Sequence, residues 1–62
     1  MKVREVIQII KEDGWFLSRQ RGSHRQFHHA TKSGCVTVPG HPSDEVRPGT
    51  LASIMKQAKV RR

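Results

Sequence analysis

The residues Arg21-Gly22-Ser23-His24-Arg25 place one imidazole among guanidinium groups. Histidine is the only side chain whose unperturbed pKa lets it exchange a proton near neutral pH. Arginine binds phosphate through a rigid fork of N–H donors. A proton-transfer group beside phosphate-binding groups is the combination that cleavage of an RNA backbone requires. His24 is therefore the first candidate for chemistry in this chain.

We expect His24 to act as a general base. Three arginines lie within a few residues of it, at positions Arg19, Arg21 and Arg25. Nearby positive charge disfavours the imidazolium form, and a neutral imidazole can accept a proton from a ribose 2′-hydroxyl. The arginines would bind the phosphate and offset charge in the transition state. On composition alone, a surface histidine in a basic loop is the competing interpretation.

Ser23 and His41 are further candidates for RNA contacts. Ser23 adjoins His24 on one strand end and usually faces elsewhere, so we expect its hydroxyl to bond a phosphate or cap the turn rather than act as a nucleophile. His41 follows the third predicted strand, whose end lies beside the start of the second in an antiparallel hairpin. His41 can therefore lie at the same sheet edge as His24, as a phosphate binder or second acid–base group. A loop histidine without such a role is the alternative.

A metal site is not expected. His28 and His29 are adjacent, so on a strand they point to opposite faces and only one can join a given site. The chain has no HxxxH or HExxH pattern, and Cys35 is its one cysteine. We expect no cofactor. We also expect the Cys35 thiol to be packed, because it adjoins Val36 in an apolar alternating run.

Two amphipathic helices are predicted, one near each end of the chain. The first spans about three turns, because its apolar residues recur at i, i+3, i+4 and i+7. It ends at Gly14, since glycine is favoured just after the last turn of a helix. The second has the same spacing and can begin at Pro48. Basic residues at Lys59, Arg61 and Arg62 place positive charge where it complements the dipole of the second helix. The apolar positions are Val3, Val6, Ile7 and Ile10, then Leu51, Ile54, Met55 and Ala58.

Three strands are predicted between the helices, over residues 15–20, 25–30 and 35–38. In the first strand we expect Phe16 or Leu17 to face the core. Short turns join the strands, so the sheet is antiparallel. The order is α-β-β-β-α, an α+β fold in which both helices cover one face of a three-stranded sheet. The opposite face is left for solvent or a partner.

Charge is the strongest compositional signal. The 62 residues include 12 Lys and Arg against 5 Asp and Glu, a net charge of +7 that favours a polyanionic partner, nucleic acid first. We expect a single domain over residues 1–62. No long basic amphipathic face with bulky anchors and no 18-residue apolar stretch favours a membrane. With one cysteine and no signal-peptide pattern, we expect a cytoplasmic protein.

Four motifs match one known family, in the same order along nearly the whole chain. They are Gly14-Trp15-Phe16, Arg21-Gly22-Ser23-His24, Val36-Thr37-Val38-Pro39 with Gly40-His41, and Pro48-Gly49-Thr50-Leu51 leading into Ile54-Met55-Lys56-Gln57-Ala58. On these residues the chain resembles the HicA toxins, small ribonucleases of HicA–HicB toxin–antitoxin pairs in bacteria and archaea. The tail from Lys59 to Arg62 departs from the family pattern. The family often has a glycine and a further apolar residue at these positions.

The resemblance implies a double-stranded-RNA-binding-domain-like fold. It implies cleavage of mRNA without a metal, in a prokaryotic cytoplasm, with His24 as the catalytic residue. It also implies a HicB-like antitoxin that covers the active site, and contact with DNA only through that antitoxin. The family motif does not assign a catalytic role to His41.

Two alternatives to an endoribonuclease toxin are open. The first is a non-catalytic RNA-binding module of the same fold, which would contact phosphates and 2′-hydroxyls. The second is a small DNA-binding regulator, which is disfavoured because no helix-turn-helix is apparent. For the endoribonuclease, we expect RNA to be bound by Arg19, Arg21, Ser23, Arg25 and His41.

Overall fold

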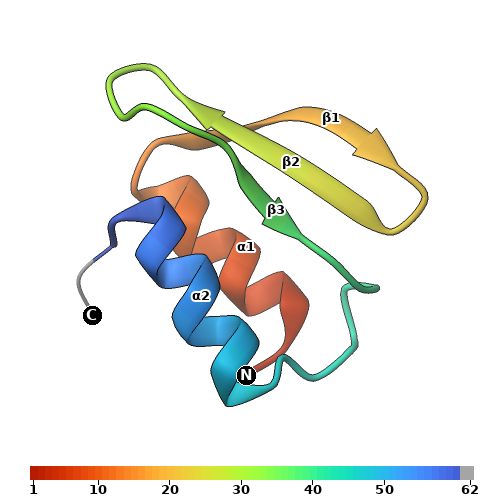
Figure 1. The fold of residues 1–62 in the computed structure, drawn as a ribbon. Helices are drawn as coiled ribbons and strands as arrows, with labels where there is room; N and C mark the ends of the chain where they lie inside the picture. The colour runs from red at the N-terminus through yellow and green to blue at the C-terminus, as the bar shows by residue number, and fades with distance from the viewer. Residues whose placement is uncertain (61–62) are drawn as a thin grey trace.

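A three-stranded sheet and two helices form two layers in the computed structural model, which describes residues 1–60 (Figure 1). Helices α1 (Val3–Glu12) and α2 (Pro48–Ala58) lie on the same side of the sheet. The strands are antiparallel in the order β1-β2-β3, with bounds Trp15–Arg21, His24–His29 and Val36–Val38. The predicted α+β fold and its element order are confirmed. The basic residues Arg61 and Arg62, predicted to complement the dipole of α2, lie outside the described residues.

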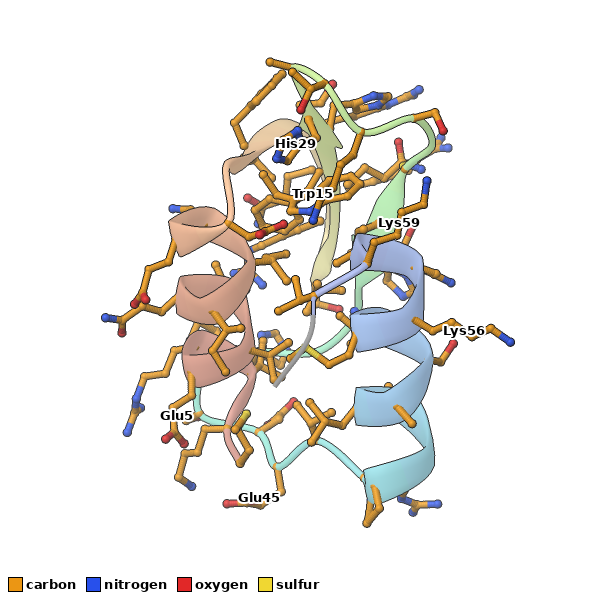
Figure 2. The ribbon with its side chains drawn as sticks, turned by 90° about the vertical axis from the view of Figure 1, so that its left-hand side faces the viewer. Glu5, Trp15, His29, Glu45, Lys56 and Lys59 are labelled. Atoms are coloured by element: carbon orange, nitrogen blue, oxygen red, sulfur yellow. The ribbon has the colours of Figure 1, made fainter. Side chains whose placement is uncertain are left out.

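The core lies between the helices and the inner face of the sheet. Trp15 is almost fully buried, and its indole Nε1–H donates to the Ala58 carbonyl at 3.1 Å, which satisfies the polar atom of the ring. Figure 2 shows Trp15 close to His29, and the two ring centroids lie 5.2 Å apart in an edge-on arrangement. The buried residues are Val3, Val6, Ile10, Trp15, Phe27, Val36, Val38, Ile54 and Ala58.

Neither Phe16 nor Leu17 belongs to the buried core, although the sequence predicts that one of them faces it and Leu17 lies on the helix side of the sheet. Trp15 takes the core position opposite His29, so Phe16 falls on the open face of the sheet and is 52% exposed. Leu17 returns to the helix side opposite Phe27 but remains 45% exposed. Both side chains therefore leave apolar surface on β1.

The expectation of a packed Cys35 thiol is also wrong, because Cys35 is exposed. Strand β3 begins one residue later, and its two valines, Val36 and Val38, are both buried. Since side chains alternate along an extended chain, the residue before Val36 faces outward.

A polar cluster around Lys32 joins the carboxyl ends of both helices. The Lys32 ammonium donates to the Asp13 carboxylate at 2.5 Å, to the Lys59 carbonyl at 3.0 Å and to the Ala58 carbonyl at 3.3 Å. The imidazole of His29 accepts backbone N–H groups at Nδ1, so its Nε2–H donates to the Asp13 carbonyl at 2.7 Å. A cation is favourable at the negative ends of two helix dipoles. This cluster fixes the end of the sheet remote from His24.

Acid is expected to weaken the Lys32 cluster. The hydrogen bond from Lys32 lowers the pKa of Asp13 below its ordinary value of 3.8. Because the folded pKa is the lower one, the stabilisation is complete above about pH 3.8 and is lost as the pH falls through the folded value. Asp13→Asn should therefore flatten the dependence of unfolding free energy on pH in this acidic range. Urea unfolding at several pH values measures this dependence. If the unfolding free energy of the wild type and of Asp13→Asn changed equally with pH, the lowered pKa of Asp13 would be contradicted.

The end of α2 can be stabilised by a glycine. Lys59 adopts a left-handed conformation with φ 54°, which strains a residue with a Cβ. Lys59→Gly should raise the unfolding free energy by about 1 kcal/mol, since the carbonyl that Lys32 binds is retained. Lys56→Gly, inside the same helix, should instead lower it by about 1 kcal/mol. Thermal unfolding of both variants makes the comparison, and destabilisation by Lys59→Gly would contradict it.

Candidate active site

The open face of the sheet gathers two of the predicted arginines around His24. His24 and Gln26 are exposed on β2, whereas Arg25 between them points to the helix side. Arg21 pairs with His24 across β1 and β2, and Arg19 pairs with Gln26. Directly opposed residues in such a pair have Cβ atoms about 4.5–5.5 Å apart. The imidazole therefore has a guanidinium group as its cross-strand neighbour.

A β-bulge between Leu17 and Arg19 brings both arginines to this face. Regular pairing after Leu17 would place Arg19 opposite Arg25, on the helix side. The register instead shifts by one residue, so that Arg19 pairs with Gln26 and Arg21 follows on the same face. No residue type marks this bulge, so the sequence alone does not assign the arginines to a face.

A hollow of about 320 Å³ lies beside His24 on the open face, and we call it the cationic hollow. Arg19 and Arg21 are both exposed, and within residues 1–60 neither forms an ion pair. Their charges are therefore available to an anionic ligand beside His24. The lining residues are Arg19, Arg21, His24, Gln26 and Thr37.

A second hollow, the α2 hollow, has a volume of about 370 Å³ and lies where β3 meets α2. His24 and Thr37 line both hollows, so the imidazole lies at their boundary. Thr37 and the contributions of α2 were not predicted, because only the packing of α2 beside β3 brings them to His24. The lining residues are His24, Thr37, Pro39, Gly49, Thr50, Ser53, Ile54 and Gln57.

The other three predicted site residues, Ser23, Arg25 and His41, are not part of the lining of either hollow. Arg25 is half-buried, and its Nη1 donates to the Gly40 carbonyl at 3.1 Å. Ser23 is half-buried in the turn between β1 and β2. His41 is exposed in the loop after β3, where its backbone N–H donates to the Asp44 carboxylate at 2.9 Å.

The adjacent histidines His28 and His29 point to opposite faces of β2, as the alternation predicts. Residues 1–60 contain no group of three or more His, Cys, Asp and Glu side chains that could hold a metal ion. In the same part of the chain, neither helix is long and apolar enough to cross a membrane.

The family assignment rests on nearly the full length of the fold. Residues 3–60 match the family model described as the HicA toxin of bacterial toxin–antitoxin systems. The chain belongs to the HicA toxin family. The match spans both helices, all three strands and every residue that lines the two hollows. This HicA-family chain is therefore the toxin of a toxin–antitoxin pair and has an antitoxin as its partner. A comparison with curated proteins gives no significant match.

Proposed function

We propose that this HicA-family toxin is a metal-independent endoribonuclease that cleaves mRNA and so inhibits translation and growth. The observation that supports the proposal most is the position of His24 on the boundary of the cationic hollow, opposite Arg21 and close to Arg19. The imidazole is exposed, so a strand of RNA can reach it without any opening of the fold. A toxin that needs no metal would act as soon as its antitoxin is lost.

The proposed reaction begins with His24 as general base. Its imidazole removes the proton from a ribose 2′-hydroxyl, and the 2′-oxygen then attacks the adjacent phosphorus. The bond from phosphorus to the 5′-oxygen breaks, which leaves a 2′,3′-cyclic phosphate on one product. The departing 5′-oxygen takes a proton from water, which reaches the open face. Positioned acid–base catalysis of this kind contributes about 10²- to 10⁴-fold to the rate.

Arg19 and Arg21 would bind the scissile phosphate. Two guanidinium groups offer charge-assisted hydrogen bonds to its oxygens, and these strengthen as negative charge builds up in the transition state. For Ser23, Arg25 and His41, contact with RNA stays a prediction. It requires RNA to extend beyond the hollows to the β1–β2 turn and the loop after β3. The hydrogen bond of Arg25 to Gly40 gives that side chain a role in holding the loop.

We further propose that the antitoxin is HicB-like and covers the open face. Two arginines without ion pairs among the described residues require acidic groups opposite them in such a complex. The antitoxin would then block His24 and neutralise the phosphate site in one contact. Any contact with DNA would come from the antitoxin, and the pair would act in the prokaryotic cytoplasm.

Cleavage in the absence of free metal tests the proposal. The purified protein is incubated with a labelled single-stranded mRNA fragment in EDTA, and cleavage and binding are followed on separate gels. We expect discrete cleavage products. Binding of intact RNA without any products would contradict the proposal and favour a non-catalytic RNA-binding module.

A further inference from the structure

The α2 hollow differs in chemistry from the cationic hollow beside it. Thr50, Ser53 and Gln57 lie at i, i+3 and i+7 on one face of α2, and each side chain has both a donor and an acceptor. Apart from His24, the residues that line this hollow carry no charge, whereas the cationic hollow has Arg19 and Arg21. The α2 hollow therefore suits a neutral group with hydrogen-bonding edges more than a second phosphate.

The α2 hollow has apolar residues in its lining on which a flat ring could lie. Ile54 is only 3% exposed and yet lines the hollow, so it forms part of the floor, and Pro39 adds a second apolar surface. The volume of about 370 Å³ falls in the range of small-molecule sites, roughly 300–1,000 Å³. Bases flipped out of a stack are read in a similar way, with the ring between aromatic or apolar side chains and its edge hydrogen-bonded.

Gly49 leaves open space in the lining of the α2 hollow. It lies in the first turn of α2, where glycine is less favourable than alanine for the helix. A Cβ at this position would meet no atom within 4 Å, so the fold itself has room for a side chain. Since the residue also lines the hollow, the space is open to a ligand.

We propose that the α2 hollow binds the nucleobase of a nucleotide next to the scissile phosphate, and that Thr50, Ser53 and Gln57 distinguish the bases. His24 lies between this hollow and the phosphate-binding arginines, so one nucleotide can place its base and its phosphate on either side of the imidazole. The inference rests on the proposed RNA cleavage, because it assigns the two hollows to parts of one substrate.

Binding of single nucleotides tests the inference without any cleavage. The four nucleoside 3′-monophosphates, inorganic phosphate and ribose 5-phosphate are titrated separately, and backbone amide shifts are followed by NMR. We expect phosphate and ribose phosphate to move the amides around Arg19 and Arg21. Only nucleotides should also move those of Ser53 and Gln57, with unequal affinities among the four bases. Equal shifts in α2 from inorganic phosphate, or no shifts there from any nucleotide, would overturn the inference.

Two variants and a matched control sharpen the test. Gln57→Ala should weaken the preferred nucleotide about tenfold, which corresponds to the loss of a good hydrogen bond, and should leave the affinity for inorganic phosphate unchanged. Gly49→Leu should block the base while the fold stays intact. Gln8→Ala, at an exposed position of α1, should change neither affinity. Unchanged nucleotide affinity in both hollow variants would overturn the inference, whether or not the protein cleaves RNA.

Discussion

Replacement of His24 by alanine is expected to lower the rate of RNA cleavage by about 10²- to 10⁴-fold, the range that positioned acid–base catalysis contributes. The imidazole is exposed and contributes nothing to the core, so the fold and the affinity for RNA should be retained. Single-turnover cleavage of a labelled RNA in EDTA gives the rate. Thermal unfolding confirms that the variant is folded.

His28→Ala is the matched control for the His24 variant. His28 is exposed on the same face of the same strand, but it lines neither hollow. The His28→Ala protein should therefore cleave RNA at close to the wild-type rate. Equal activity of the wild type and His24→Ala would refute the assignment of His24. An equal loss in both variants would likewise contradict a specific catalytic role for His24.

Removal of both arginines of the cationic hollow is expected to have the next largest effect. The double substitution Arg19→Ala with Arg21→Ala should lower cleavage by about 10²-fold or more, since each arginine stabilises charge on the phosphate in the transition state. It should also weaken binding of single-stranded RNA. The slope of log affinity against log salt should fall by about 0.7 for each phosphate that the variant no longer neutralises.

Arg4→Ala with Lys11→Ala controls for the loss of two positive charges. Both side chains are exposed on α1, which covers the opposite side of the sheet, so the salt slope should change little. Binding is measured by fluorescence anisotropy of a labelled RNA at several salt concentrations. An unchanged slope in the double arginine variant of the open face would exclude a phosphate-binding role for Arg19 and Arg21.

The sequence predicts the elements well because their signals are local. The i, i+3, i+4 and i+7 spacing of Val3, Val6, Ile7 and Ile10 places α1, and Pro48 marks the start of α2. Short turns between the strands require an antiparallel sheet. The core side of β1 is not predictable in the same way, because Trp15, Phe16 and Leu17 are all apolar. The pairing of Trp15 with His29 in the folded sheet places Trp15, rather than Phe16 or Leu17, in the buried core.

The candidate site depends on features that no local pattern encodes. A bulge of one residue after Leu17 decides that Arg19 lies on the same face of the sheet as His24, and the register decides that Arg25 does not. The α2 hollow combines residues more than twenty positions apart, so it exists only once α2 packs beside β3. His24 itself is found from sequence because its neighbours along the chain are already cationic.

The ends of the RNA products test the central claim most directly. RNA cut by the wild-type protein in EDTA is analysed by mass spectrometry, beside a substrate with a single 2′-deoxy nucleotide at the cleaved position. We predict a 2′,3′-cyclic phosphate on one fragment, a 5′-hydroxyl on the other, and no cleavage of the 2′-deoxy substrate. Products with a 5′-phosphate, or normal cleavage of the 2′-deoxy substrate, would contradict 2′-hydroxyl attack promoted by His24.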